Sequence, residues 1–215
     1  MKKIILSFVC VFIALSASAQ RASSSSTSFF STEASDQPIT FGIRGGVNFA
    51  NVSTSEDGYT VSYKSNTGFH AGMIVDIPLM ESLYLQSGLY YIVKGYKESD
   101  EITANPAYLE IPILASYRYN FSDAAQLQVN FGPYLAYGIS GKIKEEYRGE
   151  SHEEDYFNDH TNKFDAGLQV GAGITISQHF YLGIAYEFGL TNVLKDSGDD
   201  SMKNTNFLVS VGYNF

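Results

Sequence analysis

Ionisable side chains recur inside segments of this chain that are otherwise apolar or built from small residues. In these segments apolar residues alternate one by one with small or polar residues. The ionisable side chains occupy the second series of positions, which also holds most of the glycines. The set consists of Arg44, His70, Asp76, Lys94, Glu110, Arg118, Asp165 and Glu187. Charges that are removed from water are stable only when they are paired. The sequence therefore predicts a network of opposite charges on one face of the fold.

Hydrolytic chemistry would need a nucleophile, a base and an orienting group within hydrogen-bond reach. His70 could be the base, with Ser62 or Ser65 as nucleophile and Glu187 as orienting carboxylate. Their spacing gives no evidence that they meet. We therefore predict no enzyme, no catalytic residue and no cofactor, and a small lipid-modifying barrel enzyme stays as an alternative.

Residues 142–160 form an acidic segment that also contains His152 and His160. Clustered oxygens suit Ca²⁺ or Mg²⁺, but no known calcium-loop spacing is present. Charge runs usually stay hydrated. We therefore predict an acidic, metal-free loop, and the same holds for the aspartates of residues 196–200. Tyrosines near the loops predict either a contact surface or an interfacial girdle. These are Tyr59, Tyr63, Tyr96, Tyr147 and Tyr156.

The N-terminus has the pattern of a secretory signal peptide over residues 1–19. Lys2 and Lys3 precede an apolar run, and Ala17-Ser18-Ala19 supplies a cleavage site before Gln20. Residues 20–40 are rich in serine, which predicts a flexible periplasmic tether. The single cysteine, Cys10, would be removed with the signal, so the mature chain would contain no disulfide.

The formal charge of the whole chain is −9. An acidic protein lacks the positive surface that nucleic-acid binding requires. We therefore expect no nucleic-acid partner.

The elements that position the charged residues are short alternating segments between residues 41 and 215. Apolar or aromatic residues alternate with small or polar ones eight times, in segments of about ten residues, the length at which a tilted strand crosses a bilayer. The segments are 41–50, 67–77, 82–94, 109–119, 127–140, 164–176, 180–190 and 207–215. This pattern predicts an all-β fold, an eight-stranded antiparallel up-and-down transmembrane β-barrel.

The connections alternate in length. Short links are predicted at 78–81, 121–125 and 177–178, and long polar ones at 51–64, 95–106, 141–162 and 193–203. Short turns at one end and long loops at the other are typical of outer-membrane barrels. We therefore predict an outer-membrane protein with a periplasmic N-terminus and extracellular long loops.

The lumen of an eight-stranded barrel is too narrow for rings of aromatic side chains. The apolar face must then point outward, which water disfavours and lipid requires. The charged residues fill the lumen as a plug, with Lys94 paired to Glu110 and with Asp76 bridging Arg44 and Arg118. We expect no wide pore.

The chain ends on an aromatic strand, Tyr213-Asn214-Phe215. A terminal aromatic strand is similar to the sorting signal that barrel assembly machinery recognises, so Tyr213 and Phe215 are expected to contact that machinery, in addition to outer-membrane lipid.

Several motifs resemble one family. Residues 42–48 and 68–72 are similar to the first hairpin of the PorT-like outer-membrane β-barrel family, and 85–91 and 108–114 are similar to its third and fourth strands. The resemblance spans 41–215 and implies the fold and the compartment. Some relatives support protein secretion. We therefore expect an interaction or structural protein of the envelope, contacting an envelope protein or an extracellular ligand, and alternatively an accessory component of a secretion or assembly machine.

Overall fold

The computed structural model describes residues 37–56, 59–99, 101–122, 124–147, 150–158, 161–195 and 201–215. The predicted signal peptide and nearly all of the predicted tether lie outside these ranges. Within them, no helix is long and apolar enough to cross a membrane.

The described chain is built from strands. Eight of the described strands are long and successive in a ring. They are β1 (Thr40–Glu56), β3 (Lys64–Pro78), β4 (Leu83–Val93), β6 (Ile102–Ser122), β7 (Ala125–Tyr147), β9 (Phe164–Ile176), β10 (Phe180–Gly189) and β11 (Ser201–Asn214). Shorter strands are β2 (Tyr59–Ser62), β5 (Tyr96–Lys97) and β8 (Glu150–Asp155).

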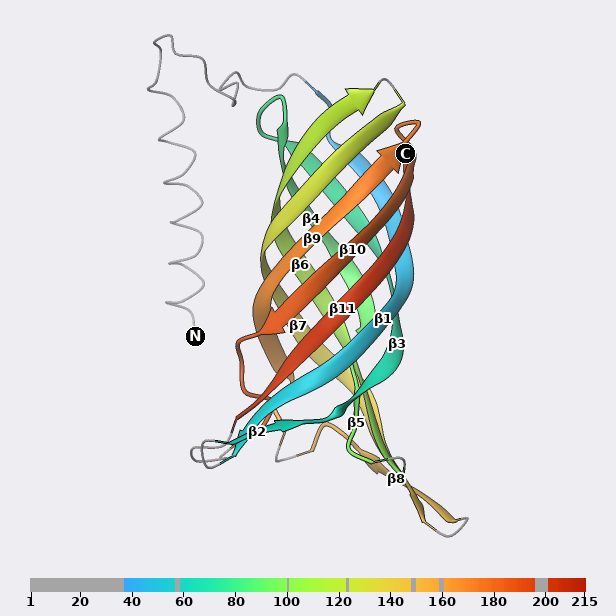
Figure 1. Cartoon of the computed structure of the whole chain (residues 1–215), viewed down its shortest axis with the longest axis vertical. Coiled ribbons are helices and arrows are strands. Elements are labelled where there is room, and N and C mark those ends of the chain that lie inside the picture. The colour runs from blue at the N-terminus through green and yellow to red at the C-terminus, as the bar shows by residue number, and fades with distance from the viewer. Residues whose placement is uncertain are drawn as a thin grey trace.

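Each long strand pairs antiparallel with its neighbours in the chain, and the ring closes because β1 pairs with both β3 and β11. The strands run obliquely around a barrel (Figure 1). The prediction of an eight-stranded antiparallel up-and-down barrel is confirmed. We call the end that carries the chain's C-terminus the turn end, and the opposite end the long-loop end.

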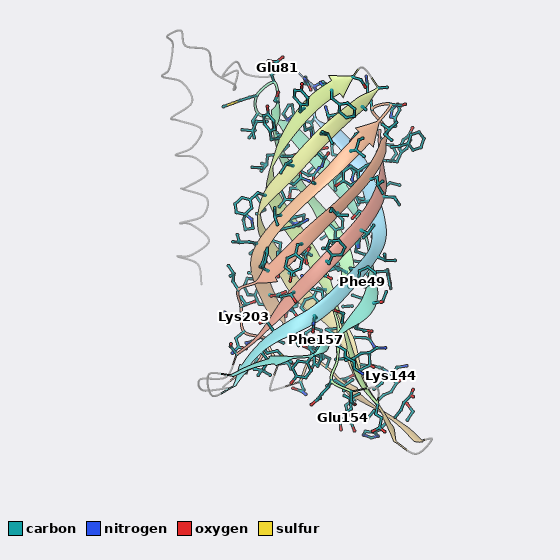
Figure 2. The ribbon with its side chains drawn as sticks, in the orientation of Figure 1. Phe49, Glu81, Lys144, Glu154, Phe157 and Lys203 are labelled. Carbon is teal, nitrogen blue, oxygen red and sulfur yellow. The ribbon has the colours of Figure 1, made fainter. Side chains whose placement is uncertain are left out.

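The alternation of side chains is inside-out, as the sequence predicts. Phe207 and Phe215 are 37% and 70% exposed on the outer wall, whereas Lys94 and Glu110 are 1% and 2% exposed. Apolar side chains cover the outside of the barrel (Figure 2). The physical cause is space, because the lumen of eight strands accepts small and polar groups more readily than rings of aromatic residues.

Ser87 is the polar exception on the apolar outer face. Its hydroxyl donates a hydrogen bond of 2.8 Å to the carbonyl oxygen of Pro112 on the neighbouring strand. The bond satisfies a group that would otherwise be costly in an apolar environment.

The strands are longer than the sequence predicts at the long-loop end. β1 continues to Glu56, β6 begins at Ile102 and β7 continues to Tyr147, so much of three predicted loops is strand. The prediction used apolar alternation as its marker, and that alternation stops while backbone pairing continues. A small sheet extends beyond the barrel at this end, and we call it the ribbon (Figure 1). It consists of residues 102–105, 142–147 and 150–155.

The short turns predicted at the other end are confirmed. β3 and β4 are joined by residues 79–82, and β9 and β10 by residues 177–179. Ser177 and Gln178 both have positive φ, 51° and 65°. The nitrogen of His179 donates to Ile176 O, which closes a turn with positive φ at both central residues, as in type I′.

Gln178→Gly is expected to stabilise the barrel by about 0.5–1 kcal/mol, because glycine adopts positive φ without steric cost. Urea unfolding in detergent micelles measures the change. Gln178→Ala is the matched control and should bring no gain, since alanine keeps the strain. A Gln178→Gly variant that is less stable than the parent would show that the positive φ of residue 178 does not strain the turn.

Candidate functional site

The side chains of the predicted charge network all point into the lumen and are buried. They separate into two groups along the barrel. Lys94, Glu110, Asp165 and Glu187 lie together toward the long-loop end, and Asp76 and Arg118 lie toward the turn end. Arg44 and His70 line the space between the two groups.

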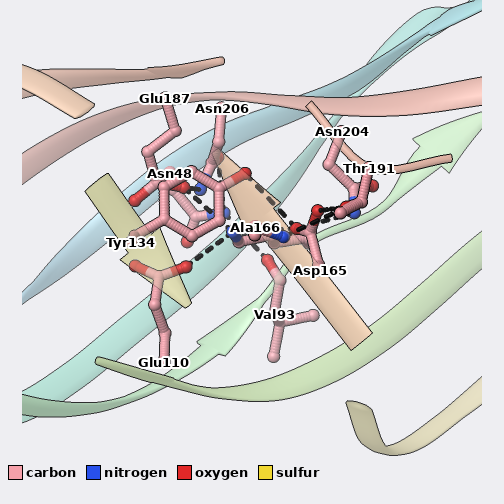
Figure 3. A network of polar contacts seen from close by, with 11 residues as sticks. Asn48, Val93, Glu110, Tyr134, Asp165, Ala166, Glu187, Thr191, Asn204 and Asn206 are labelled. Atoms are coloured by element: carbon pink, nitrogen blue, oxygen red, sulfur yellow. Dashed lines mark hydrogen bonds and ion pairs between the residues drawn. The ribbon is translucent and has the colours of Figure 1, made fainter. Parts of the chain in front are cut away.

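Lys94 is the centre of the first group, whose carboxylates Glu110, Asp165 and Glu187 are drawn in Figure 3. It follows directly after β4, and its Nζ atom lies 2.6 Å from Glu110, 3.1 Å from Glu187 and 3.5 Å from Asp165. The ammonium also lies 4.1 Å from the centre of the Tyr134 ring. The predicted contact with Glu110 is present, and the structure adds two further carboxylates from β9 and β10. We call these four ionised side chains the Lys94 cluster.

Neutral donors complete the coordination of Asp165. The Thr191 hydroxyl donates to its Oδ1 at 2.7 Å, and the Asn204 amide and the Tyr134 hydroxyl donate to its Oδ2 at 3.0 and 3.3 Å. Four donors, including Lys94, therefore face this carboxylate among the described residues. Hydrogen bonds from several donors to one carboxylate are strong and fix the position of its side chain.

Asparagines extend the Lys94 cluster to the seam where the barrel closes. Asn206 on β11 donates to Glu187 at 3.2 Å, and Asn48 on β1 donates to Asn206 at 3.1 Å. Asn48 also donates to the carbonyl oxygen of Val93 at 2.8 Å. The network thus joins the first and last strands through the lumen as well as through their backbones.

The second group is an ion pair between Arg118 and Asp76 at 2.7 Å. Gln86 donates to the same carboxylate at 2.8 Å, and Arg118 lies over the Tyr84 ring at 4.1 Å. The prediction that Asp76 also bridges to Arg44 is wrong. The Arg44 guanidinium instead lies over the ring of Tyr181, a lumen residue, at 3.9 Å, and donates to the carbonyl oxygen of Ile43 at 3.2 Å.

Of the two serines considered as a nucleophile beside His70, the structure describes the side chain of Ser65 and places it away from His70. His70 Nε2 lies 2.8 Å from Ser210 Oγ in the lumen, whereas Ser65 is exposed. Residues five apart on a strand point to opposite faces, so Ser65 cannot share the face of His70. The side chain of Ser62 lies outside the described part of the chain.

A cavity of about 40 Å³ lies between the two charged groups and is lined by Arg44, His70, Glu110, Glu187 and Ser210, among others. Buried atoms on these residues that have no hydrogen-bond partner within the described chain include Arg44 Nη2, His70 Nδ1 and Glu187 Oε1. A polar space of this size holds about three water molecules, which would satisfy them.

An aromatic cap closes the lumen at the long-loop end. Tyr156 and Val193 are buried against Ala104, and Phe157 packs edge-on against Tyr156 and Tyr108 at 5.1 and 5.5 Å. The Phe157 ring lies over Gly138, where a Cβ atom would come within 2.1 Å of it. Tyr156 is therefore a sealing residue, and its interpretation as part of a contact surface or girdle is wrong.

The turn end of the lumen is an open vestibule of about 650 Å³. Its walls are mostly amides and hydroxyls, and Arg118 and Tyr84 lie at its inner end. Between the vestibule and the cap, the side chains of the Asp76–Arg118 pair and of the Lys94 cluster therefore cross the described lumen.

The terminal aromatics lie outside the lumen, at the turn end. Tyr213 stacks on His179 at 5.2 Å and packs edge-on against Phe180 and Phe215. This places an exposed aromatic edge at the end of β11. Recognition of Tyr213 and Phe215 by assembly machinery stays a prediction.

Within the acidic segment, residues 142–147 and 150–155 pair as antiparallel strands, and charged side chains pair across them. Lys142 contacts Glu153, and Lys144 lies 3.2 Å from it. The bond from Lys142 lowers the pKa of Glu153. Among the described residues, no group of three or more His, Cys, Asp or Glu side chains is arranged to hold a metal ion.

Sequence reasoning missed the neutral partners of the charges, namely Asn48, Tyr134, Thr191, Asn204 and Asn206. Strand parity carries a usable signal for four of them, because Asn48 shares the phase of Arg44, Tyr134 that of Gln128, and Asn204 and Asn206 that of Ser210. Asn204 and Asn206 lie on β11. The prediction began this strand at residue 207 and so left them out. Which carboxylate each amide binds depends on strand register, which the sequence does not reveal.

A closed ring with an apolar exterior and a charge-filled lumen defines a small barrel of the outer-membrane type. The family model described as "Outer membrane protein beta-barrel domain" matches residues 19–195. The chain belongs to this family, which places it in the outer membrane.

Solved structures of small outer-membrane barrels are similar to this chain. Ail, the attachment invasion locus protein of Yersinia pestis, is 19% identical over 83% of this chain and 100% of Ail, with a TM-score of 0.44. Neisserial surface protein A is 13% identical over 83% and 98%, with a TM-score of 0.46. The outer membrane enzyme PagL is 14% identical over 79% and 97%, with a TM-score of 0.45. No curated protein matches the chain.

Lys94→Met is expected to destabilise the barrel by about 3–5 kcal/mol, because it leaves buried carboxylates without their cation. Urea unfolding of the refolded protein in micelles measures the loss. The control is Lys142→Met on the exposed ribbon, which should stay within about 0.5 kcal/mol of the parent. Equal midpoints for the Lys94→Met variant and the parent would show that the Lys94 cluster does not stabilise the fold.

Proposed function

We propose that this chain is a non-enzymatic outer-membrane barrel that acts as an interaction or structural protein of the cell envelope. The observation that carries the proposal is the ribbon, which continues the barrel strands beyond the apolar wall. Residues 151–155 of β8 are all exposed, and the described part of β8 pairs with β7. The partner would be an envelope protein or an extracellular ligand.

The orientation of the barrel follows from the connections. The described chain begins and ends at the turn end (Figure 1), and the ribbon, with Lys144 and Glu154, projects from the opposite end (Figure 2). Outer-membrane barrels place short turns in the periplasm and long connections outside. The ribbon, with Lys144 and Glu154, would therefore be at the cell surface.

Two features favour an interaction role over catalysis or conduction. His70 is buried in the lumen behind the aromatic cap, where a lipid substrate has no access. Side chains of the Lys94 cluster and the Asp76–Arg118 pair cross the lumen, as is usual for small barrels.

Within the family, the motifs quoted from the sequence favour a PorT-like relative. Such a protein could also serve a secretion or assembly machine, in which case its contacts would lie at the periplasmic end.

Cysteine labelling tests the orientation, because the predicted mature chain has no cysteine. Glu154→Cys on the ribbon should react with a membrane-impermeant maleimide in intact cells. Glu81→Cys at the turn end should react only after the outer membrane is permeabilised. The parent chain is the control for background labelling, and the reverse pattern would contradict the proposed orientation.

Site-specific photocrosslinking tests the interaction role. A photoreactive residue in place of Ser151 should give discrete adducts with an envelope protein or surface polymer in living cells. Replacement of residues 144–153 by Asn-Gly, which joins the register partners Ile143 and Glu154 by a favoured hairpin turn, should leave the barrel folded. Its boiled and unboiled forms should still differ in gel mobility.

The matched control is the same photoreactive residue in place of Glu81. Adducts from position 81 alone would favour the role in a secretion or assembly machine. The absence of adducts from both positions in correctly inserted protein would contradict an interaction role.

A further inference from the structure

The lumen between the Asp76–Arg118 pair and the aromatic cap is a buried chamber with unequal formal charge. Its basic side chains are Lys94 and Arg44, and its acidic side chains are Glu110, Asp165 and Glu187. All five are at most 5% exposed. With every group in its usual state, this described set carries one negative charge in excess. An uncompensated buried charge is strongly unfavourable.

Other titratable side chains that face the Lys94 cluster and the cavity are neutral in their usual state. They come from the strands on all sides of the chamber: His70 on β3, Tyr90 on β4, Tyr108 on β6, Tyr134 on β7 and Tyr181 on β10. His70 is already hydrogen-bonded to Ser210. Asp76 is neutralised by Arg118 and contributes no excess.

The surroundings of each carboxylate decide where the excess charge lies. Asp165 accepts from Thr191, Asn204 and Tyr134 as well as from Lys94, so its oxygens are fully engaged as acceptors. A proton on Asp165 would face hydrogen-bond donors and would find no acceptor among these partners.

Glu110 and Glu187 differ from Asp165. Their Oε2 atoms both lie within 3.1 Å of the same Nζ of Lys94, so the two carboxyl groups lie beside one ammonium. The second oxygen of Glu187, Oε1, is buried without a partner and belongs to a residue that lines the cavity. Two adjacent carboxylates in a buried site cannot both ionise at ordinary cost.

We propose that Glu110 and Glu187 share one proton, so that the chamber is a proton-binding site whose formal charges cancel. The neighbouring cavity, lined by Arg44 and His70, holds the water through which the proton exchanges. This inference does not depend on the proposed envelope function.

A proton fits this site better than a metal ion. The ammonium of Lys94 already occupies the position between the carboxylates. In the described part of the chain, the His, Cys, Asp and Glu side chains form no group of three suited to a metal.

The shared proton makes barrel stability depend on pH. In the unfolded chain both glutamates lose their protons near pH ~4.3, so above that value the native state holds one proton more. The unfolding equilibrium constant then rises about tenfold for each pH unit, until the chamber itself releases the proton. Stability is lost as pH rises.

Glu110→Gln tests this dependence, because glutamine keeps the shape and carries neither the charge nor the proton. The experiment is urea unfolding of the full chain in micelles between about pH 5.5 and 8.5. The ratio of the parent's unfolding constant to that of Glu110→Gln should rise about tenfold per pH unit. Glu187→Gln should behave in the same way, which covers failure of the first variant to fold. The control is Glu153→Gln on the exposed ribbon, which should keep the parent's slope.

Infrared spectroscopy supplies a second readout. The parent at about pH 7 should show the carbonyl band of a protonated carboxyl, shifted in D₂O, and both glutamine variants should lose it. Equal pH slopes for the parent and both variants, or a parent spectrum without the band, would overturn the proposal. A stability that differs between Na⁺ and K⁺ salts at the same pH would also overturn it, because the balancing charge would then be a metal ion.

Discussion

The rest of the structure depends on the buried ammonium of Lys94 and the carboxylates that surround it. These side chains come from β6, β9, β10 and the residue after β4, and asparagines connect them to the seam between β1 and β11. Buried charges are tolerated only when they are paired and hydrogen-bonded. The wall of the barrel can therefore be apolar on the outside because its polar residues satisfy each other on the inside.

This arrangement separates the molecule into parts with different physical roles. The outer wall meets lipid, the lumen is filled with paired charges, and Tyr156 and Phe157 cover those charges from the long-loop end. Beyond the cap the same strands continue as the exposed ribbon, where Glu153 is paired with lysines in water. Surface pairs of that kind contribute little to stability, whereas the buried cluster is expected to contribute a large share.

The proton proposed for Glu110 and Glu187 follows from the same geometry. A lumen closed by aromatic side chains at one end and by the Asp76–Arg118 pair at the other has little solvent to screen an excess charge. The charge must therefore be balanced within the chamber. The uncharged amide and hydroxyl donors around Asp165 decide which carboxylates carry the proton.

Much of the fold was predictable from the sequence, because alternation with a period of two fixes which side chains share a face. The strand number, the short turns and the inward direction of Arg44, Lys94, Glu110 and Glu187 all follow from that period and from the narrowness of an eight-stranded lumen. The ribbon was not predictable in this way, because strand pairing beyond the membrane leaves no apolar alternation.

The partners within the lumen were decided by the tertiary structure. Parity places Asp76, Arg44 and Arg118 on one face, but only Arg118 reaches the carboxylate among these described residues, and Arg44 lies over the ring of Tyr181 instead. Likewise, the sequence determined that Lys94 and Glu110 meet across adjacent strands, whereas the closure of the ring brought Asp165 and Glu187 to the same ammonium. The physical reason is that alternation is a local property of each strand, while contacts across a lumen depend on the stagger and curvature of the whole ring.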